Sequence, residues 1–170
     1  SESYTITINP WKLIITFDSS TPSDPPVTPP GTTYTGSSIT SSGTGVTTSD
    51  LVISDAGTIT DIDVELNGTS NQEYYWQHKD IKLISPYGTI VDLQVTNNFS
   101  SYELINTILD DEASGGIETG TAPYMGSYQP DGNLSDFDGE SMTGTWQLWI
   151  YSSESYTITI NPWKLIITFD

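Results

Sequence analysis

Short runs in which apolar and polar residues alternate make up much of the chain after residue 50. In the run at 143–151, Trp146, Leu148 and Ile150 stand at every second position. This period of two is typical of a β-strand with one buried face. The same pattern predicts strands at 51–54, 58–66 (with Ile59, Ile62, Val64 and Leu66 apolar), 80–86, 89–95, 143–151 and 163–169 (with Trp163, Leu165, Ile167 and Phe169 apolar).

Gly, Asn, Asp and Pro separate these runs about every ten residues, a spacing that predicts an all-β sandwich or barrel. Between two runs, Ser-Pro-Tyr-Gly-Thr at 85–89 predicts a hairpin turn, because Gly88 tolerates the positive φ of such turns. The rest of 96–142 is predicted to be loop. Only 108–116 has the pattern of a helical turn, which Gly115 and Gly116 would end.

The first eighteen residues, SESYTITINPWKLIITFD, recur unchanged at 153–170. Between them, residues 19–31 contain five prolines, which exclude a helix or a central strand and predict a semi-extended spacer. If 32–170 forms a complete domain, its own last copy fills the closing position. Residues 1–18 are then surplus and belong to a neighbouring module or act as a donor segment.

Three interpretations of the repeat stay open. In the first, the chain is part of a tandem array with a period of 152 residues, counted from Ser1 to Ser153. In the second, 1–18 inserts as a donor strand into another chain, which would build fibres. In the third, the repeat has no biological meaning. The predicted assembly interface is Tyr4, Ile6, Ile8, Trp11, Leu13, Ile15 and Phe17.

The net charge of −18 excludes most anionic partners. The chain has twenty-two acidic residues and only four basic ones, so it would repel phosphate backbones and anionic lipids. We therefore expect neither a nucleic-acid partner nor membrane insertion, and no apolar run approaches the roughly 20 residues of a membrane helix. The chain has no Cys, which excludes disulfides and thiolate metal sites. No signal peptide heads the sequence, as expected of a mature secreted fragment.

Catalysis has little support in the sequence. His78 is the only histidine, and no nucleophile motif accompanies it. Carboxylate pairs are so numerous that no single pair stands out as a glycosidase dyad. We predict that the chain is not an enzyme.

Five ordered motifs carry a family resemblance over most of the chain. They are GTITDIDVELN at 57–67, HKDIKLISPYGT at 78–89, ILDDEA at 108–113, YQPDGNLSDFDGESMTGTWQLWI at 128–150 and NPWKLIITF at 161–169. Together they resemble the P domain, or Homo B domain, of subtilisin-like proprotein convertases and bacterial secreted proteases. The resemblance implies a jelly-roll-like β-sandwich, similar to galactose-binding domains, without catalytic residues of its own. His78-Lys79 departs from the family's Arg-Gly at that turn.

Calcium is the predicted cofactor, because it prefers six to eight oxygen ligands and Asp110, Asp111 and Glu112 crowd three carboxylates together. The resemblance implies that Asp80, on a neighbouring strand, completes the site. The alternative is that Asp110 caps a turn while the others face water. A weaker candidate site is Asp131, Asp136, Asp138 and Glu140, whose spacing departs from Asp-x-Asp-x-Asp-Gly and also suits a simple Asp- and Gly-rich turn.

These observations predict a non-catalytic, secreted structural module, stabilised by calcium and joined end to end with copies of itself in a filament, stalk or adhesin. A fibre of strand-exchanged separate chains is one alternative. A C-terminal P domain that stabilises a secreted subtilisin-like protease is the other, with an upstream protease domain as its partner.

Overall fold

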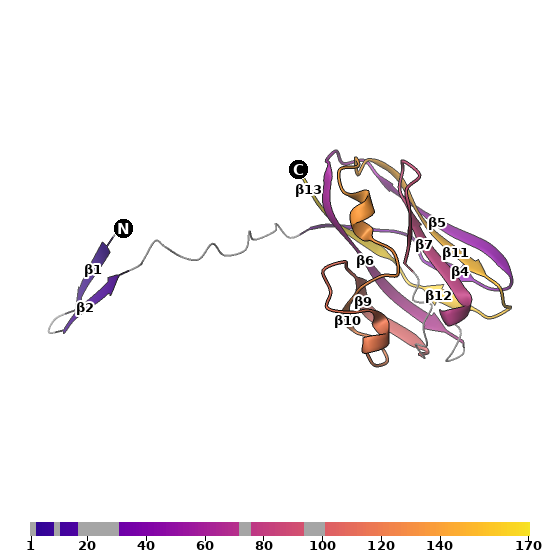
Figure 1. Cartoon of the computed structure of the whole chain (residues 1–170), viewed down its shortest axis with the longest axis horizontal. Helices are drawn as coiled ribbons and strands as arrows, with labels where there is room; N and C mark the ends of the chain where they lie inside the picture. Colours follow the sequence, from indigo (N-terminus) through magenta and orange to yellow (C-terminus); the bar gives the residue numbers. More distant parts are fainter. Residues whose placement is uncertain (1–2, 9–10, 17–30, 72–75, 94–100) are drawn as a thin grey trace.

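The computed structural model describes residues 3–8, 11–16, 31–71, 76–93 and 101–170. From residue 31 on, two sheets pack face to face as a β-sandwich (Figure 1). The first sheet has seven strands: β3 (Thr32–Thr35), β4 (Ile39–Ser41), β6 (Ile59–Ser70), β9 (Glu103–Leu109), β10 (Gly126–Tyr128), β12 (Ile158–Ile160) and β13 (Lys164–Phe169). The second has four: β5 (Gly45–Ile53), β7 (Lys79–Ile84), β8 (Ile90–Asp92) and β11 (Gly144–Ser152).

The described helices are three short 3-10 turns: η1 (Trp76–His78), η2 (Ile117–Thr119) and η3 (Leu134–Phe137). None of them is long and apolar enough to cross a membrane. The predicted fold class, an all-β sandwich, is confirmed.

The core lies between the sheets and follows from the alternation in the sequence. On β11, Trp146, Leu148 and Ile150 point inward and are fully buried, and Leu165 and Ile167 of β13 meet them from the opposite sheet. Trp163, just before β13, donates its indole N–H to Ser49 Oγ at 3.0 Å, which joins the two sheets through a polar contact. Burial of apolar area of this kind is the main favourable term in folding.

Strand β6 is the centre of the seven-stranded sheet. One of its edges pairs with β9, and the other pairs first with β13 and then with β12, end to end. The pairing of β6 with β13 changes register at one point, because Thr168 pairs with Asp61 whereas the next residue, Phe169, pairs with Ile59. This β-bulge explains why the buried residues Ile59 and Ile62 are three positions apart before the regular alternation of β6 begins.

The predicted turn at 85–89 is confirmed. Ser85 N–H donates to the Thr89 carbonyl at 2.9 Å, Gly88 has φ +88°, and the turn joins the antiparallel strands β7 and β8. The predicted strands at 51–54 and 163–169 belong to β5 and β13 with shifted ends. The predicted strand at 89–95 is observed as β8 at Ile90–Asp92, and residues 94–95 lie outside the described residues.

In 108–116 the predicted helical turn is reduced to a single hydrogen-bonded turn, in which the Ala113 N–H donates to the Asp110 carbonyl at 3.2 Å. The prediction of loop for the rest of 96–142 was wrong at 126–128, which forms strand β10, and above all at 103–109, which forms strand β9. The cause is a bulge opposite Asn67, where the pairing jumps from Leu66↔Thr107 to Gly68↔Leu104. Asn106 takes a left-handed conformation there, with φ +48°, so Leu104 and Thr107 are buried three positions apart. That spacing imitates a helical period.

The repeated segment pairs in two different ways. In the first copy, β1 (Ser3–Ile8) and β2 (Trp11–Thr16) pair with each other, with Ile8 opposite Trp11. In the second copy, β12 and β13 each pair with β6, while β4 and β3 flank them. The predicted interface residues Tyr4, Ile6, Ile8, Trp11, Leu13 and Ile15 fall in β1 and β2, and Phe17 lies outside the described residues. Most of the predicted linker, 19–30, lies outside them too.

Candidate functional site

The outer face of β6 carries a row of polar side chains. Ile62, Val64 and Leu66 point into the core, so the residues between them, together with Asp61 and Asn67, point away from it and are partly buried. This row consists of Asp61, Asp63, Glu65 and Asn67. Three carboxylates on one strand face need compensation, since like charges two positions apart repel each other.

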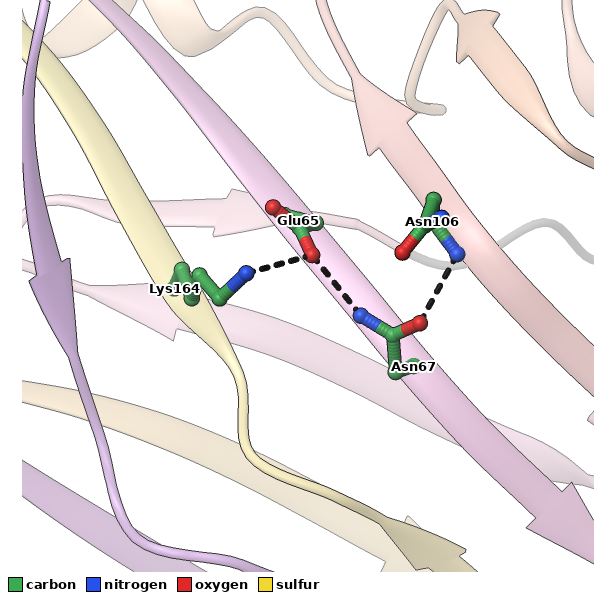
Figure 2. A network of polar contacts seen from close by, with 4 residues as sticks. All are labelled: Glu65, Asn67, Asn106 and Lys164. Carbon is green, nitrogen blue, oxygen red and sulfur yellow. Dashed lines mark hydrogen bonds and ion pairs between the residues drawn. The ribbon is translucent and has the colours of Figure 1, made fainter.

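One end of the row is compensated (Figure 2). Lys164 Nζ of β13 lies 2.7 Å from Glu65 Oε1, and the same oxygen accepts a hydrogen bond from Asn67 Nδ2 at 2.8 Å. Asn67 Oδ1 in turn accepts from the Asn106 N–H of β9 at 2.8 Å. The network ties three neighbouring strands together at the bulge, which makes it a structural feature.

The other end of the row is not compensated in this way. Asp61 and Asp63, together with Thr60, line a shallow pocket of about 340 Å³ with Asp110 and Glu112, which follow β9. The antiparallel register pairs Val64 with Leu109, and one further step sets Asp110 opposite Asp63. We call Asp61, Asp63, Asp110 and Glu112 the acidic patch.

Crowding in the acidic patch makes its carboxyl groups harder to ionise. Burial, followed by repulsion from Asp110 and Asp61, raises the pKa of Asp63 to about 7. Burial also raises the pKa of Asp61, and a hydrogen bond with Asp110 raises that of Glu112. A cation or a proton would relieve this repulsion.

The lysines whose side chains the structure describes are all engaged elsewhere. Lys164 binds Glu65, and Lys82 Nζ lies 3.3 Å from Asp80 and 3.8 Å from Asp92. Lys79 is buried, with its Nζ donating to Ser152 Oγ and to the Tyr156 carbonyl, and burial lowers its pKa. None of these three neutralises the acidic patch.

The structure does not bring Asp80 to Asp110, Asp111 and Glu112. Asp80 lies on β7 between the buried residues Lys79 and Ile81, so it points away from the core on the four-stranded sheet. The acidic patch lies on the outer side of the other sheet, and the sandwich core separates the two. The predicted four-residue calcium site is therefore not assembled, and Asp80 forms an ion pair with Lys82 instead.

Asp110 and Asp111 have local partners. Asp110 Oδ1 accepts the Glu112 N–H at 2.7 Å, as the turn-capping alternative predicts. Asp111 reaches across to η3, where its two carboxylate oxygens accept the N–H groups of Leu134 at 2.9 Å and Ser135 at 2.8 Å. Asp111 thus caps η3 from a distant part of the chain, as an N-cap side chain does for a helix.

The second predicted set does not converge on one point. Asp131 lines a different pocket of about 330 Å³ with Asp111, while Glu140 accepts a hydrogen bond from the Thr89 hydroxyl. Asp136 and Asp138 are exposed, and the partial desolvation of Asp138, followed by repulsion from Asp61, raises the pKa of Asp138. Among the described residues, no three His, Asp or Glu side chains are arranged to hold a metal ion.

Sequence reasoning missed Asp61 and Asp63 as members of the candidate site. Their signal was present, since both are acidic residues on the polar face of a predicted strand. Their neighbour Asp110 could not be placed, because strand β9 was not predicted.

The sequence model of the proprotein convertase P-domain family matches residues 59–167, which span strands of both sheets. The chain belongs to this family. This match confirms the family resemblance that the five motifs indicated. P domains are non-catalytic accessory domains of proteases.

Two solved structures similar to this P-domain chain are the serine protease of Aeromonas sobria and the complex of that protease with its chaperone ORF2. The first is 13% identical with a TM-score of 0.43, and the second is 14% identical with a TM-score of 0.42. The alignments cover 82% and 84% of this chain but only 27% and 28% of those chains. The comparison with curated proteins found no match.

Replacing Asp63 by Asn is expected to stabilise this P domain at pH 8 in the absence of divalent cations. The native pKa of Asp63, about 7, lies above its ordinary value of 3.8, so the folded state binds more protons between these limits. The free energy of unfolding therefore falls as the pH rises from about 4 to about 7. Asn cannot ionise, so the variant does not lose stability in this way. Because Asp63 is only half-buried, we expect its free energy of unfolding at pH 8 to exceed that of the wild type by about 1–2 kcal/mol.

Urea unfolding at pH 4.5 and pH 8 would measure this difference. The gain should be present at pH 8 and nearly absent at pH 4.5, where wild-type Asp63 is protonated. Asp50→Asn, at an exposed position on β5, is the control and should change stability by less than about 0.5 kcal/mol at either pH. An Asp63→Asn gain that is equal at both pH values would contradict the assigned repulsion.

Proposed function

We propose that residues 32–170 act as an accessory P domain that packs beside the catalytic domain of a secreted protease and stabilises it. The observation that carries the proposal is the family match over 59–167, which covers most of the sandwich. The chain spans only about a quarter of the length of the two protease structures above, and the catalytic domain that the proposal requires would be encoded elsewhere in the protein.

A surface for such a neighbour exists on the outer face of the four-stranded sheet. Val46 of β5 lies opposite Tyr151 of β11, and both are exposed. Trp149 stacks beside Tyr151 with ring centroids 6.3 Å apart, and Val52 is exposed on the same side of β5. Exposed apolar side chains gathered on one face are typical of a surface that another protein covers.

The test begins with the encoding gene and continues with the catalytic domain found upstream. That domain is expressed with and without residues 32–170, and the half-life of its activity on heating is measured. We expect a longer half-life with the P domain attached, and a smaller gain when it carries Val46→Ser with Tyr151→Ser. Tyr87→Ser, at an exposed turn position, is the matched control. Equal half-lives with and without the domain would overturn the proposal.

Calcium stabilisation belongs to the same proposal, now centred on the acidic patch, whose carboxylates would have to move closer together to hold the ion. Its support is the accumulation of carboxylates that burial and mutual repulsion make hard to ionise. A cation that binds only the folded state raises the melting temperature. We expect calcium to raise the melting temperature of the wild type above its value in EDTA, and to do so less in Asp63→Asn. A melting temperature that is the same with calcium and with EDTA would refute this part.

A repeated module in a stalk, adhesin or filament is the second candidate function, favoured by the exact repeat of eighteen residues. It predicts that the gene encodes further units at the same period of 152 residues. A gene with a protease domain upstream and no further unit would leave only the accessory role.

A further inference from the structure

The last strands of the sandwich fill a defined slot. Residues 153–170 place β12 between β4 and β6 and β13 between β3 and β6. The side chains that they bury completely are Ile158, Ile160, Trp163, Leu165 and Ile167. We call the surface that receives them, formed by β3, β4 and β6 with Ser49 and Lys79, the closing slot.

Polar contacts specify how the segment sits in the closing slot. Trp163 Nε1 donates to Ser49 Oγ at 3.0 Å, and Lys164 Nζ lies 2.7 Å from Glu65. Lys79 Nζ donates to the Tyr156 carbonyl at 2.7 Å. The closing-slot residues that make these contacts all lie between the two copies of the repeat: Ser49, Glu65 and Lys79.

The first copy carries every group that the closing slot uses. Ile6, Ile8, Trp11, Leu13 and Ile15 correspond to the five buried side chains of the second copy. Lys12 corresponds to Lys164, and the Tyr4 carbonyl to that of Tyr156. Because the eighteen residues are identical, the closing slot cannot distinguish the two copies by side chain.

The chain connection also permits the first copy to enter the closing slot of its own chain. Strand β3 runs antiparallel to β13, with Thr32 opposite Ile167, so the end of β13 lies beside the start of β3. If 1–18 replaced 153–170, residues 19–31 would only have to join these adjacent ends. Thirteen residues extend to about 40 Å at about 3.1 Å per residue, which is ample.

The energetic difference between the two arrangements is small. The first copy must give up its β1–β2 pairing, and an isolated two-stranded hairpin is only marginally stable in water. The displaced second copy has the same sequence and can form the same hairpin. What remains is the difference in loop closure, which changes the equilibrium by only about threefold for each doubling of loop length.

We propose that residues 1–18 and 153–170 are alternative closing segments of one sandwich, and that either of them fills the closing slot in the same chain. When 1–18 fills it, the fold becomes a circularly permuted arrangement in which β2 takes the place of β13 next to β3. The copy left outside is then available to the closing slot of another chain.

The test disables one copy at a time in the full-length chain. Trp163→Ala should lower the ratio of folded to unfolded protein by less than about tenfold, because the intact first copy takes over, and Trp11→Ala alone should change it little. In the double variant this ratio should fall about a hundredfold or more, as expected when a buried Trp is truncated and no second copy replaces it. Trp146→Ala is the matched control, because Trp146 has no copy and its loss should be the same whether or not Trp11→Ala is also present.

A cross-link gives a second readout that does not depend on stability. The chain has no Cys, so a disulfide can form only between introduced residues. Thr33 lies opposite Ile166 on β13, and Ile14 corresponds to Ile166. In the Trp163→Ala background, Thr33→Cys with Ile14→Cys should form an intramolecular disulfide; Thr33→Cys with Ile166→Cys should do so in the wild type.

The outcomes distinguish exchange within one chain from exchange between chains and from no exchange. Rescue of Trp163→Ala in a monomer, with the intramolecular cross-link, supports the proposal. Equal losses in Trp163→Ala and in the double variant would overturn it, as would the absence of the cross-link between positions 14 and 33. Rescue that occurs only in dimers or larger species, by sedimentation at several concentrations, would also overturn exchange within one chain and indicate exchange between chains.

Discussion

Replacing Trp146 by Ala is expected to reduce the free energy of unfolding by about 3–5 kcal/mol, the largest effect of any single change considered. The Trp146 side chain is fully buried, packs edge to face on Phe137 with centroids 5.1 Å apart, and donates its indole N–H to the Met142 carbonyl at 3.0 Å. The substitution leaves a cavity and an unpaired carbonyl. Because small domains have only about 5–15 kcal/mol of stability, the variant should unfold at a much lower temperature than the wild type.

Chemical unfolding followed by circular dichroism would measure the loss. Trp149→Ala is the matched control, since Trp149 lies on the same strand but points outward, where it stacks on Tyr151 and its ring centroid lies 5.7 Å from Lys82 Nζ. It should cost about 1 kcal/mol or less. Equal losses at the two positions would contradict the inward and outward assignment on β11.

The parts of the fold that the sequence predicted are those in which alternation is regular and long. Strand β11 and strand β13 each bury every second side chain over most of their length, and both were located to within one residue. The turn at 85–89 was predictable for a different reason, since a glycine with positive φ is a local requirement that needs no tertiary contact.

The parts that escaped prediction depend on contacts between distant segments. Strands β3, β4 and β12 are only three or four residues long, too short for a period to be recognised. Strand β9 has a bulge at Asn106 that turns its buried spacing from two positions into three. Without β9, no local pattern could place Asp110 beside Asp63.

The candidate site shows the same division. Sequence reasoning grouped Asp110, Asp111 and Glu112 because they are adjacent in the chain, whereas the structure places Asp110 and Glu112 in the acidic patch and directs Asp111 to η3. It joined them to Asp80 through family resemblance, and the structure places Asp80 on the opposite outer face of the sandwich. The alternation within β7 shows that Asp80 points away from the core, but a single strand does not show to which of the two sheets it belongs.

Replacing Asp111 by Ala is expected to destabilise the domain by about 2 kcal/mol. Its two carboxylate oxygens accept the N–H groups that begin η3, and the buried side chains of Leu134 and Phe137 hold this turn against the core. Charged acceptors make stronger hydrogen bonds than neutral ones, and without them both N–H groups lose their partner. Relief of repulsion on Asp61 and Asp63 offsets part of the loss.

Unfolding measured in calcium and in EDTA distinguishes this capping role from a metal-ligand role. If Asp111 acts as a cap, the loss in Asp111→Ala should be the same in both buffers, because its oxygens are occupied by backbone groups. Asp136→Ala, at an exposed position on η3, is the matched control and should cost less than about 0.5 kcal/mol. A loss that disappears in EDTA would show instead that Asp111 stabilises the domain through a bound cation, with its contacts to η3 playing a minor part.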